Sequence, residues 1–198
     1  MEESHRRGIP GLDWQQDLDH GWFARGAQAL NGKWVYKVKR DQNGKITRFK
    51  ARWVVKGYEQ EYGINYDQTY ARVVKNMSWR SLIAIAAQYD FEIEQMDVVT
   101  AFLYGEITEE IYVEFPIGFN KDRKVCKLLK GLYGLKQAPR LWEQKRKEAF
   151  HKLGFELLDS DYCVYNTLCG LSRITIATFV DDFLLIRPLL TKVNNLKI

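Results

Sequence analysis

The pattern of hydrophobic and polar positions becomes regular near residue 33 and predicts a β-hairpin. Residues 33–40 alternate, and residues 45–56 form a second alternating run after the turn sequence Asp41-Gln42-Asn43-Gly44. The apolar faces of the two strands carry Trp34, Tyr36 and Val38, and Phe49, Ala51, Trp53 and Val55. The second strand carries cations on its other face: Arg48, Lys50, Arg52 and Lys56. The hairpin can therefore pack on one side and hold phosphates on the other.

Two later segments have the spacing of amphipathic helices. Residues 78–90 (SWRSLIAIAAQYD) predict a scaffold helix with Ser78 as its N-cap. Pro139 suits the first turn of a helix that runs to Leu153, and Gly154 is its expected C-cap. We expect the second helix to bury Trp142, Ala149, Phe150 and Leu153, and to expose Arg140, Lys145, Arg146 and Lys152.

Short alternating runs predict strands over residues 91–98, 110–115 and 125–129, and again near residues 155, 163 and 173. The first of these strands ends at Asp97, and residues 99–104 can form a short helical turn. The run ITIATFVDDFLLIR, residues 174–187, then predicts a tight hairpin with Asp181 and Asp182 at its tip. Two carboxylates ~4 Å apart repel by ~1 kcal/mol in water and ~4 kcal/mol at a protein surface, so a cation should neutralise them.

Composition supports a folded protein. With 198 residues and 46% hydrophobic content, the chain can build one ordinary domain or two subdomains that share a core. It contains no apolar run of transmembrane length and no signal-peptide pattern near its start, which predicts an intracellular protein without a membrane partner. Cys126, Cys163 and Cys169 lack metal-ligand spacing and fit reduced thiols.

Positive charge is concentrated in the predicted basic hairpin. Residues 33–56 hold nine Lys or Arg and one acid, so they carry +8, and the rest of a chain with net charge +5 carries −3. This concentration predicts a polyanion-binding surface, although a solvated hairpin with lysines guarding its edges would show the same pattern.

Asp97 and Asp181 can form one site if their strands are neighbours in one sheet. Carboxylate oxygens suit Mg²⁺ or Mn²⁺, and no His or Cys lies near either aspartate in sequence. Two such ions about 3.5 to 4 Å apart support phosphoryl transfer. For Asp97 alone, a strand-end cap is the simpler interpretation.

Five stretches of the sequence resemble the reverse transcriptase of copia-type LTR retrotransposons. They are KWVYKVKRDQNGKITRFKARWVVKG, GINYDQTYARVV, MDVVTAFLYGEITEEIYVEFPIGF, VCKLLKGLYGLKQAPRLW and FVDD, in the family's order over residues 33–187. The resemblance implies an α+β fold, the fingers and palm of a right-hand polymerase, with an antiparallel palm sheet backed by helices. Residues 1–31 are then a poorly specified lead-in, 32–90 the fingers-like hairpin and helix, 91–187 the palm with interleaved fingers elements, and 188–198 a truncated tail without a thumb.

The resemblance also implies roles for individual residues. Asp97, Asp181 and Asp182 become the catalytic carboxylates that hold two Mg²⁺ ions, or Mn²⁺. Lys50 and Arg52 would grip the triphosphate of a dNTP, and Gln137 would contact the incoming nucleotide and the template. Phe102 matches an aromatic steric gate under the sugar, although packing in the palm core is its plainer role.

The sequence departs from the family pattern at three positions. Phe179 stands where a tyrosine near the primer is usual, Val99 where a lysine is common, and Ala71 where a proline is usual. The resemblance implies a template-primer of RNA or DNA as partner, other parts of a Pol polyprotein, and a particle-associated cytoplasmic or a nuclear location.

Three functions remain open from the sequence. The first is RNA-directed DNA polymerase, and the second is a catalytically silent remnant that binds nucleic acid through the basic hairpin, which the missing thumb favours. The third is a carboxylate-metal nuclease, which needs a further acidic ligand, for which Glu94 and Glu106 are the candidates.

Overall fold

The chain folds into two compact units. The computed structural model describes residues 18–19 (backbone only), 28–116, 125–167 and 173–188. The first unit comprises Met1–Tyr70 and Phe102–Trp142, and the second comprises Ala71–Ala101 and Glu143–Ile198. The chain therefore passes between the units three times.

The first unit contains the predicted basic hairpin, formed by β2 (Gly32–Arg40) and β3 (Ile46–Val55). Its register pairs Trp34 with Trp53 and Val38 with Phe49, so the apolar side chains of both strands share one face. Only the base of this face is covered: Trp53 is 5% exposed, whereas Phe49 near the tip is 67% exposed. The expectation that the apolar face packs is thus correct for its inner half and wrong for its outer half.

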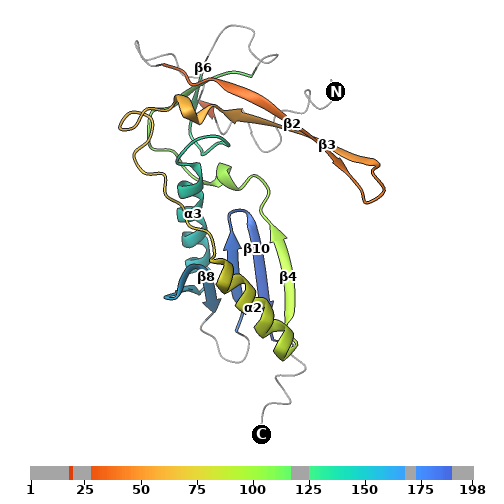
Figure 1. The fold of residues 1–198 in the computed structure, drawn as a ribbon. Helices are drawn as coiled ribbons and strands as arrows, with labels where there is room; N and C mark the ends of the chain where they lie inside the picture. Colours follow the sequence, from red (N-terminus) through yellow and green to blue (C-terminus); the bar gives the residue numbers. More distant parts are fainter. Residues whose placement is uncertain (1–17, 20–27, 117–124, 168–172, 189–198) are drawn as a thin grey trace. The chain divides into compact units, whose positions relative to one another are not determined.

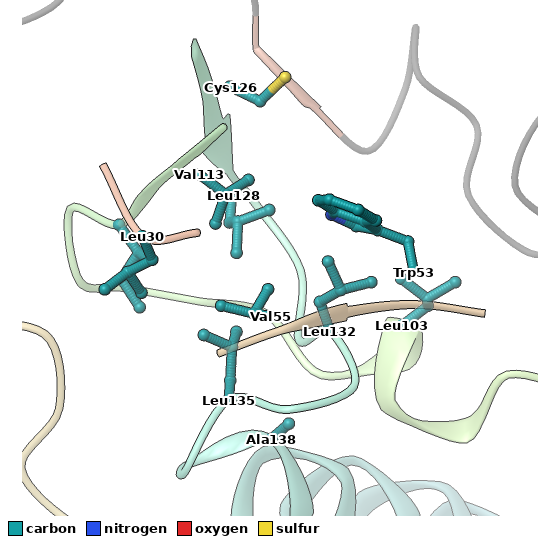
Figure 2. Packing of buried hydrophobic residues seen from close by; sticks show 11 residues of the cluster. Leu30, Trp53, Val55, Leu103, Val113, Cys126, Leu128, Leu132, Leu135 and Ala138 are labelled. Carbon is teal, nitrogen blue, oxygen red and sulfur yellow. The ribbon is translucent and has the colours of Figure 1, made fainter. Parts of the chain in front are cut away.

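A core beside the hairpin joins segments that lie far apart in the sequence. A three-stranded sheet has the order β1 (Leu18–Asp19), β6 (Val125–Leu128), β5 (Tyr112–Glu114). Figure 2 shows the buried cluster of this unit, which includes Trp53, Val55, Leu128 and Leu135. Leu30 belongs to the cluster and donates its N–H to the Tyr112 carbonyl at 2.8 Å. The packed part of the described chain therefore includes Leu30, which precedes residue 33, where the hydrophobic-polar alternation starts.

A tight turn packs against the end of β3. The N–H of Val55 donates to the carbonyl of Tyr133 at 2.9 Å. Gly134 has φ +99°, and a Cβ there would lie 2.0 Å from the Val55 carbonyl oxygen. Only glycine fits this approach, which fixes the segment that carries Tyr133 and Gln137. Two short 3₁₀ helices complete the first unit's described part, η1 (Gly57–Glu59) and η2 (Ala101–Tyr104), the latter starting at the unit boundary.

The second unit is built on a five-stranded antiparallel sheet. Its order is β4 (Glu92–Asp97), β10 (Asp182–Arg187), β9 (Thr175–Phe179), β8 (Asp161–Thr167), β7 (Phe155–Leu158). Neighbouring strands pair antiparallel throughout. Figure 1 shows β4 beside β10, which follows it by more than eighty residues. The predicted adjacency of these two strands is confirmed.

Helices cover the sheet from both faces. Ala86 of α2 (Asn76–Tyr89) packs in one buried cluster with Leu184 and Ile186 of β10. Phe150 of α3 (Ala138–Lys152) has its ring centroid 5.4 Å from that of Phe183. Because adjacent strand residues point to opposite faces, α2 and α3 lie on opposite sides of the sheet.

The predicted α+β class is confirmed, and the described part of the chain has mostly antiparallel strand pairing with few helices. Helix α3 differs from its prediction on its faces: Leu153 is 69% exposed and Ala149 is exposed, whereas Arg146 is only 2% exposed. In the described ranges no helix is both long and apolar enough to span a membrane. Cys126 and Cys163 are free and buried, as predicted for reduced thiols, and Cys169 lies outside the described residues.

Helix α2 begins with a cap supplied from across the second unit. It starts at Asn76, two residues before the predicted Ser78, and Lys75 at the N-cap position makes no capping bond with its own side chain. Instead, Asp161 accepts the N–H of Lys75 at 2.9 Å and that of Cys163 at 3.0 Å. Burial alone would raise the pKa of Asp161, but a bond from Ser78 and these N–H groups lower it overall. The carboxylate also complements the positive end of the helix.

We predict that Asp161→Ala lowers the free energy of unfolding by about 1 to 3 kcal/mol at neutral pH, because one buried N–H group, of Cys163, and one partly buried N–H group, of Lys75, lose their acceptor. The folded-state pKa lies below the ordinary value of 3.8, so the stabilisation is complete above that value and is lost as the pH falls through the folded-state pKa. Denaturant unfolding between about pH 7 and about pH 2 tests both statements. Asp159→Ala, at an exposed position two residues earlier, is the control. Equal losses for both variants would contradict the capping role.

Candidate catalytic and nucleic-acid-binding residues

The sheet of the second unit brings the predicted carboxylates to one end of one strand pair. The register pairs Asp182 of β10 directly with Asp97 of β4. Directly paired residues point to the same face, so these two side chains are neighbours, with Cα atoms about 4.5 to 5.5 Å apart. The Asp181 carbonyl accepts the N–H of Val98 at 2.9 Å, which ties the hairpin loop to the end of β4.

The loop between β9 and β10 consists of two residues, Val180 and Asp181. Phe179 pairs with Asp182, which closes the hairpin. Positive φ falls on Val180, at 56°, and not on Asp181. A β-branched residue rarely adopts this conformation, which costs on the order of 1 to 3 kcal/mol. The predicted tight hairpin is therefore confirmed with Asp181 at its tip, whereas Asp182 is the first residue of β10, and the strain falls on Val180.

The three aspartates have no cationic partner among the described residues. Asp182 accepts a hydrogen bond from the Gln95 side-chain amide at 3.2 Å, which is a neutral donor. Asp97 is exposed, and Asp181 and Asp182 are half-buried. Like charges paired across strands are destabilising, so this end of the sheet favours a bound cation.

The donor chemistry at this end suits a hard divalent ion. All three side chains offer carboxylate oxygens, the ligands that Mg²⁺ and Mn²⁺ prefer. Across the described ranges, no three His, Cys, Asp or Glu side chains are gathered closely enough to hold a metal ion. The aspartates thus suit such an ion by ligand type and by the pairing of Asp97 with Asp182, but within the described ranges they are not gathered into a three-ligand site.

Glu94, which a nuclease would need as a further ligand, lies on the other face of β4. Asp97 and Gln95 share one face, and Glu94 belongs to the alternate set. Its carboxylate accepts a bond from the Arg187 guanidinium at 2.9 Å. Glu94 is therefore engaged away from Asp97, and Glu106 belongs to the other unit.

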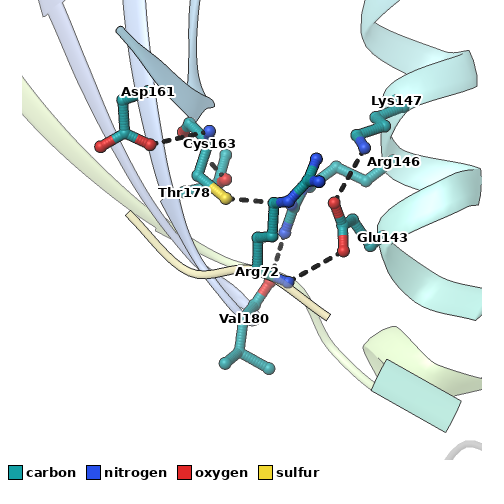
Figure 3. Close-up of polar contacts among 8 residues, drawn as sticks. All are labelled: Arg72, Glu143, Arg146, Lys147, Asp161, Cys163, Thr178 and Val180. Atoms are coloured by element: carbon teal, nitrogen blue, oxygen red, sulfur yellow. Dashed lines mark hydrogen bonds and ion pairs between the residues drawn. The ribbon is translucent and has the colours of Figure 1, made fainter. Parts of the chain in front are cut away.

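A buried arginine that the sequence places on the surface lies under the carboxylate hairpin. Arg146 of α3 donates to the Val180 carbonyl at 3.3 Å (Figure 3). Its neighbour Glu143 is 6% exposed, accepts the N–H of Arg72 at 2.9 Å and pairs with Lys147 at 2.8 Å. Burial would raise the pKa of Glu143, but these bonds and the nearby cations lower it overall. Helical periodicity predicts that a charged residue faces solvent. The sequence pattern of this helix could therefore not have identified Arg146 as buried.

The basic hairpin of the first unit sets like charges opposite one another. Its register pairs Lys37 with Lys50 and Lys39 with Arg48, on the face opposite to the apolar side chains. Such pairs are destabilising by themselves and favour a bound polyanion. The pairing register thus adds Lys37 and Lys39 to Arg48 and Lys50 as candidate phosphate ligands.

Arg52, further along the same face, belongs to a small aromatic cluster. Its guanidinium lies over the Tyr133 ring, 5.3 Å from the centroid. Phe102 contacts the same ring edge-on, with centroids 4.6 Å apart. Phe102 also packs against the buried cluster of its unit and is itself only partly buried. Arg52 and Phe102, two predicted nucleotide contacts, therefore pack against the same ring, that of Tyr133. The sequence motifs did not identify Tyr133 as a site residue.

Gln137 is buried in a hydrogen-bond network of the first unit. It is 1% exposed. Its side-chain amide donates to the Asn65 carbonyl at 2.8 Å and to Glu109 at 3.3 Å, and its oxygen accepts from Gln60 at 2.9 Å. In this structure Gln137 therefore braces the loops of its own unit, and its contact with a nucleotide and template stays a prediction. Phe179, by contrast, is 49% exposed beside the carboxylate hairpin.

Comparison with known proteins agrees with the motifs. A family model for reverse transcriptase (RNA-dependent DNA polymerase) matches residues 22–198. The chain is 45% identical over 166 residues to a retrovirus-related Pol polyprotein from transposon TNT 1-94 of Nicotiana tabacum, covering 82% of this chain. It is 39% identical over 156 residues to that from transposon RE1 of Arabidopsis thaliana, covering 77% of this chain. A Ty1-LR2 Gag-Pol polyprotein of Saccharomyces cerevisiae is 30% identical over 160 residues, or 80% of this chain.

The matched region is a small part of these relatives, amounting to 12%, 11% and 8% of their respective lengths. The family match nevertheless covers most of the chain, and the resemblance drawn from the motifs is confirmed. The chain belongs to the reverse transcriptase (RNA-dependent DNA polymerase) family, as a reverse transcriptase domain of the copia-type retrotransposon Pol polyproteins.

Proposed function

We propose that this chain is the fingers and palm region of an RNA-directed DNA polymerase that extends a primer on an RNA or DNA template. In this proposal the five-stranded sheet is the palm and the β2–β3 hairpin belongs to the fingers. One observation carries the proposal: Asp97 and Asp182 are paired across neighbouring strands, with Asp181 tied beside them, and none has a cationic partner in the described chain.

Asp97, Asp181 and Asp182 would hold two Mg²⁺ ions, or Mn²⁺. When bound, such ions neutralise the phosphates and stabilise the attacking and leaving oxygens in phosphoryl transfer. The reaction is attack by the 3′ hydroxyl of the primer on the α-phosphate of a dNTP, with pyrophosphate leaving. The carboxylates hold their geometry because they sit on a strand end and a two-residue loop, where neighbouring hydrogen bonds fix the backbone.

Residues of the first unit would bind the triphosphate and sugar. Lys50 and the cations paired around it present a positive surface to phosphates, and Arg52 is held by its stacking on Tyr133. Phe102, fixed edge-on by the same ring, offers a planar surface against a sugar. Phe179 would contact the primer end through its exposed ring.

Nucleic-acid binding without turnover is a second candidate function, and the paired like charges of the hairpin favour it. Lys37 opposite Lys50 and Lys39 opposite Arg48 give affinity for phosphates whether or not the carboxylates act. The two candidates separate in one experiment. Magnesium-dependent primer extension and filter binding are measured on the same purified chain, with strand cleavage scored on the same gel.

We expect Asp181→Asn to abolish nucleotide incorporation, because an amide cannot replace a charged ligand for a hard divalent ion. The melting temperature should stay close to that of the parent chain, since Asp181 is held by its backbone carbonyl. Asp159→Asn, an exposed aspartate in a turn of the same unit, should extend primers as the parent does. Incorporation by Asp181→Asn at the parental rate would remove this residue from the site.

Replacing Lys37 and Lys50 together by Gln should weaken template-primer binding and flatten its salt dependence. Each lost phosphate contact removes about 0.9 from the slope of log K against log salt. The melting temperature of the double variant is measured beside its affinity as a check on folding. A double variant with Gln at Lys145 and Lys152 controls for net charge. If the hairpin variant keeps the parental affinity and the parental slope of log K against log salt, this face does not bind phosphates and is only exposed to solvent.

Phe102→Val tests whether this ring selects the sugar. As a gate, its loss admits a 2′-hydroxyl and raises the ratio of rNTP to dNTP incorporation. As core packing, its loss costs on the order of 1 to 3 kcal/mol and lowers both activities together. Phe115→Val is a matched control, since Phe115 packs partly buried against the same cluster. We expect the ratio to rise for Phe102→Val alone. An unchanged ratio with a lower melting temperature would assign Phe102 to packing.

A further inference from the structure

Arg146 is a buried cation directed at the backbone of the carboxylate hairpin. It is 2% exposed, and one terminal guanidinium nitrogen donates to the Val180 carbonyl at 3.3 Å. The other terminal nitrogen lies 4.0 Å from the Cys163 sulfur, and Nε has no hydrogen-bond partner among the described residues. Figure 3 shows the side chain reaching from α3 to the loop.

The carbonyl that Arg146 contacts belongs to the central peptide of the turn. Phe179 and Asp182 are the paired flanking residues, so the peptide between Val180 and Asp181 is the middle one. Turn types that differ in the orientation of this peptide require different φ values at the two loop residues. Val180 has positive φ and Asp181 does not, which is the type II′ pattern, whereas type I′ has the central peptide flipped and positive φ at both residues. Donation to the Val180 carbonyl therefore selects the orientation that leaves Asp181 with negative φ.

Asp181 is thus held through the carbonyls on both of its sides. The preceding carbonyl, of Val180, accepts from Arg146, and its own carbonyl accepts from the N–H of Val98 at 2.9 Å. Rotating either peptide plane would move the Cα–Cβ direction of Asp181. The two bonds together fix where its carboxylate points.

An apolar residue would serve better at position 146 if packing were its only purpose. A buried charge is expensive to desolvate, and replacing it by a hydrophobic residue of similar size is often neutral or stabilising. Here the charge is offset by Glu143, which is itself buried and paired with Lys147. This arrangement keeps a strong donor in contact with one backbone carbonyl.

We propose that Arg146 is a positioning residue, which sets the orientation of the Val180–Asp181 peptide and thereby the Asp181 carboxylate. The inference rests on the proposed function in one respect: the carboxylate it positions is taken to bind a divalent ion. The orientation of the loop itself can be measured without that assumption.

The test compares Arg146→Met and Arg146→Lys with the parent chain, and uses Lys147→Met as a control. Lys147→Met removes an adjacent cation of the same network that contacts Glu143 and not the hairpin. Backbone amide exchange over residues 179–183, followed by NMR or mass spectrometry, reports on the loop. Mn²⁺ affinity, from the loss of the free-ion EPR signal, reports on the carboxylates, with Asp181→Asn as the reference for a lost ligand.

We expect hairpin amides to exchange roughly fivefold faster in Arg146→Met, the factor for one lost hydrogen bond, and Mn²⁺ to bind about tenfold more weakly. Arg146→Lys keeps the charge but loses the forked donor, so both effects should be present and smaller. Lys147→Met should match the parent in loop exchange. If Arg146→Met does not fold, Arg146→Lys decides by the same two measurements.

Two results would overturn the inference. One is parental exchange of the hairpin amides in a folded Arg146 variant. The other is tighter Mn²⁺ binding in Arg146→Met with no change in Arg146→Lys, because Arg146 would then act on the carboxylates only through its charge. Equal Mn²⁺ affinity of the parent and Asp181→Asn is a different failure, because it would remove the proposed metal site. The positioning of Asp181 would then have no purpose. The amide exchange of the loop would still show whether Arg146 orders the hairpin.

Discussion

The antiparallel pairing of β4 with β10 is the constraint on which the proposed catalytic end depends. Its register sets Asp97 opposite Asp182, and the loop that follows β9 then delivers Asp181 to the end of β4. A slip of one residue would send one of the paired carboxylates to the other face, because side chains alternate along a strand. Buried residues on both faces of β10, Phe183 on one and Leu184 on the other, oppose such a slip.

The same alternation gives the two faces of the β4–β10 pair different electrostatic roles. On one face Glu92 and Glu94 are both paired with Arg187, so these acids are neutralised within the protein. On the other face Asp97 and Asp182 have only the neutral Gln95 beside them. Glu94, one of the two acids that a nuclease would need, is therefore already paired, whereas the described residues give the aspartates of the family motif no cationic partner.

Local patterns predicted what depends on neighbours in sequence. Period-two alternation identified the basic hairpin and the strand ending at Asp97, and the β-branched run around the paired aspartates identified the last hairpin. What failed depends on partners distant in sequence. Helix α2 is capped by Asp161 rather than by its own Ser78. Helical periodicity places charged residues outside, and it has no means to recognise a buried arginine whose acceptor is a backbone carbonyl.

Both units keep unfavourable pairs of like charge, and the signs are opposite. The hairpin of the first unit pairs cations across its strands, and the sheet of the second unit pairs carboxylates across its own. A protein selected for stability alone would place opposite charges at such positions, since cross-strand pairs of opposite sign are stabilising. Polyphosphate ligands relieve the first repulsion and divalent cations relieve the second. Each unit by itself thus retains a repulsion that a ligand of the opposite charge would relieve, phosphates in the first unit and a divalent cation in the second.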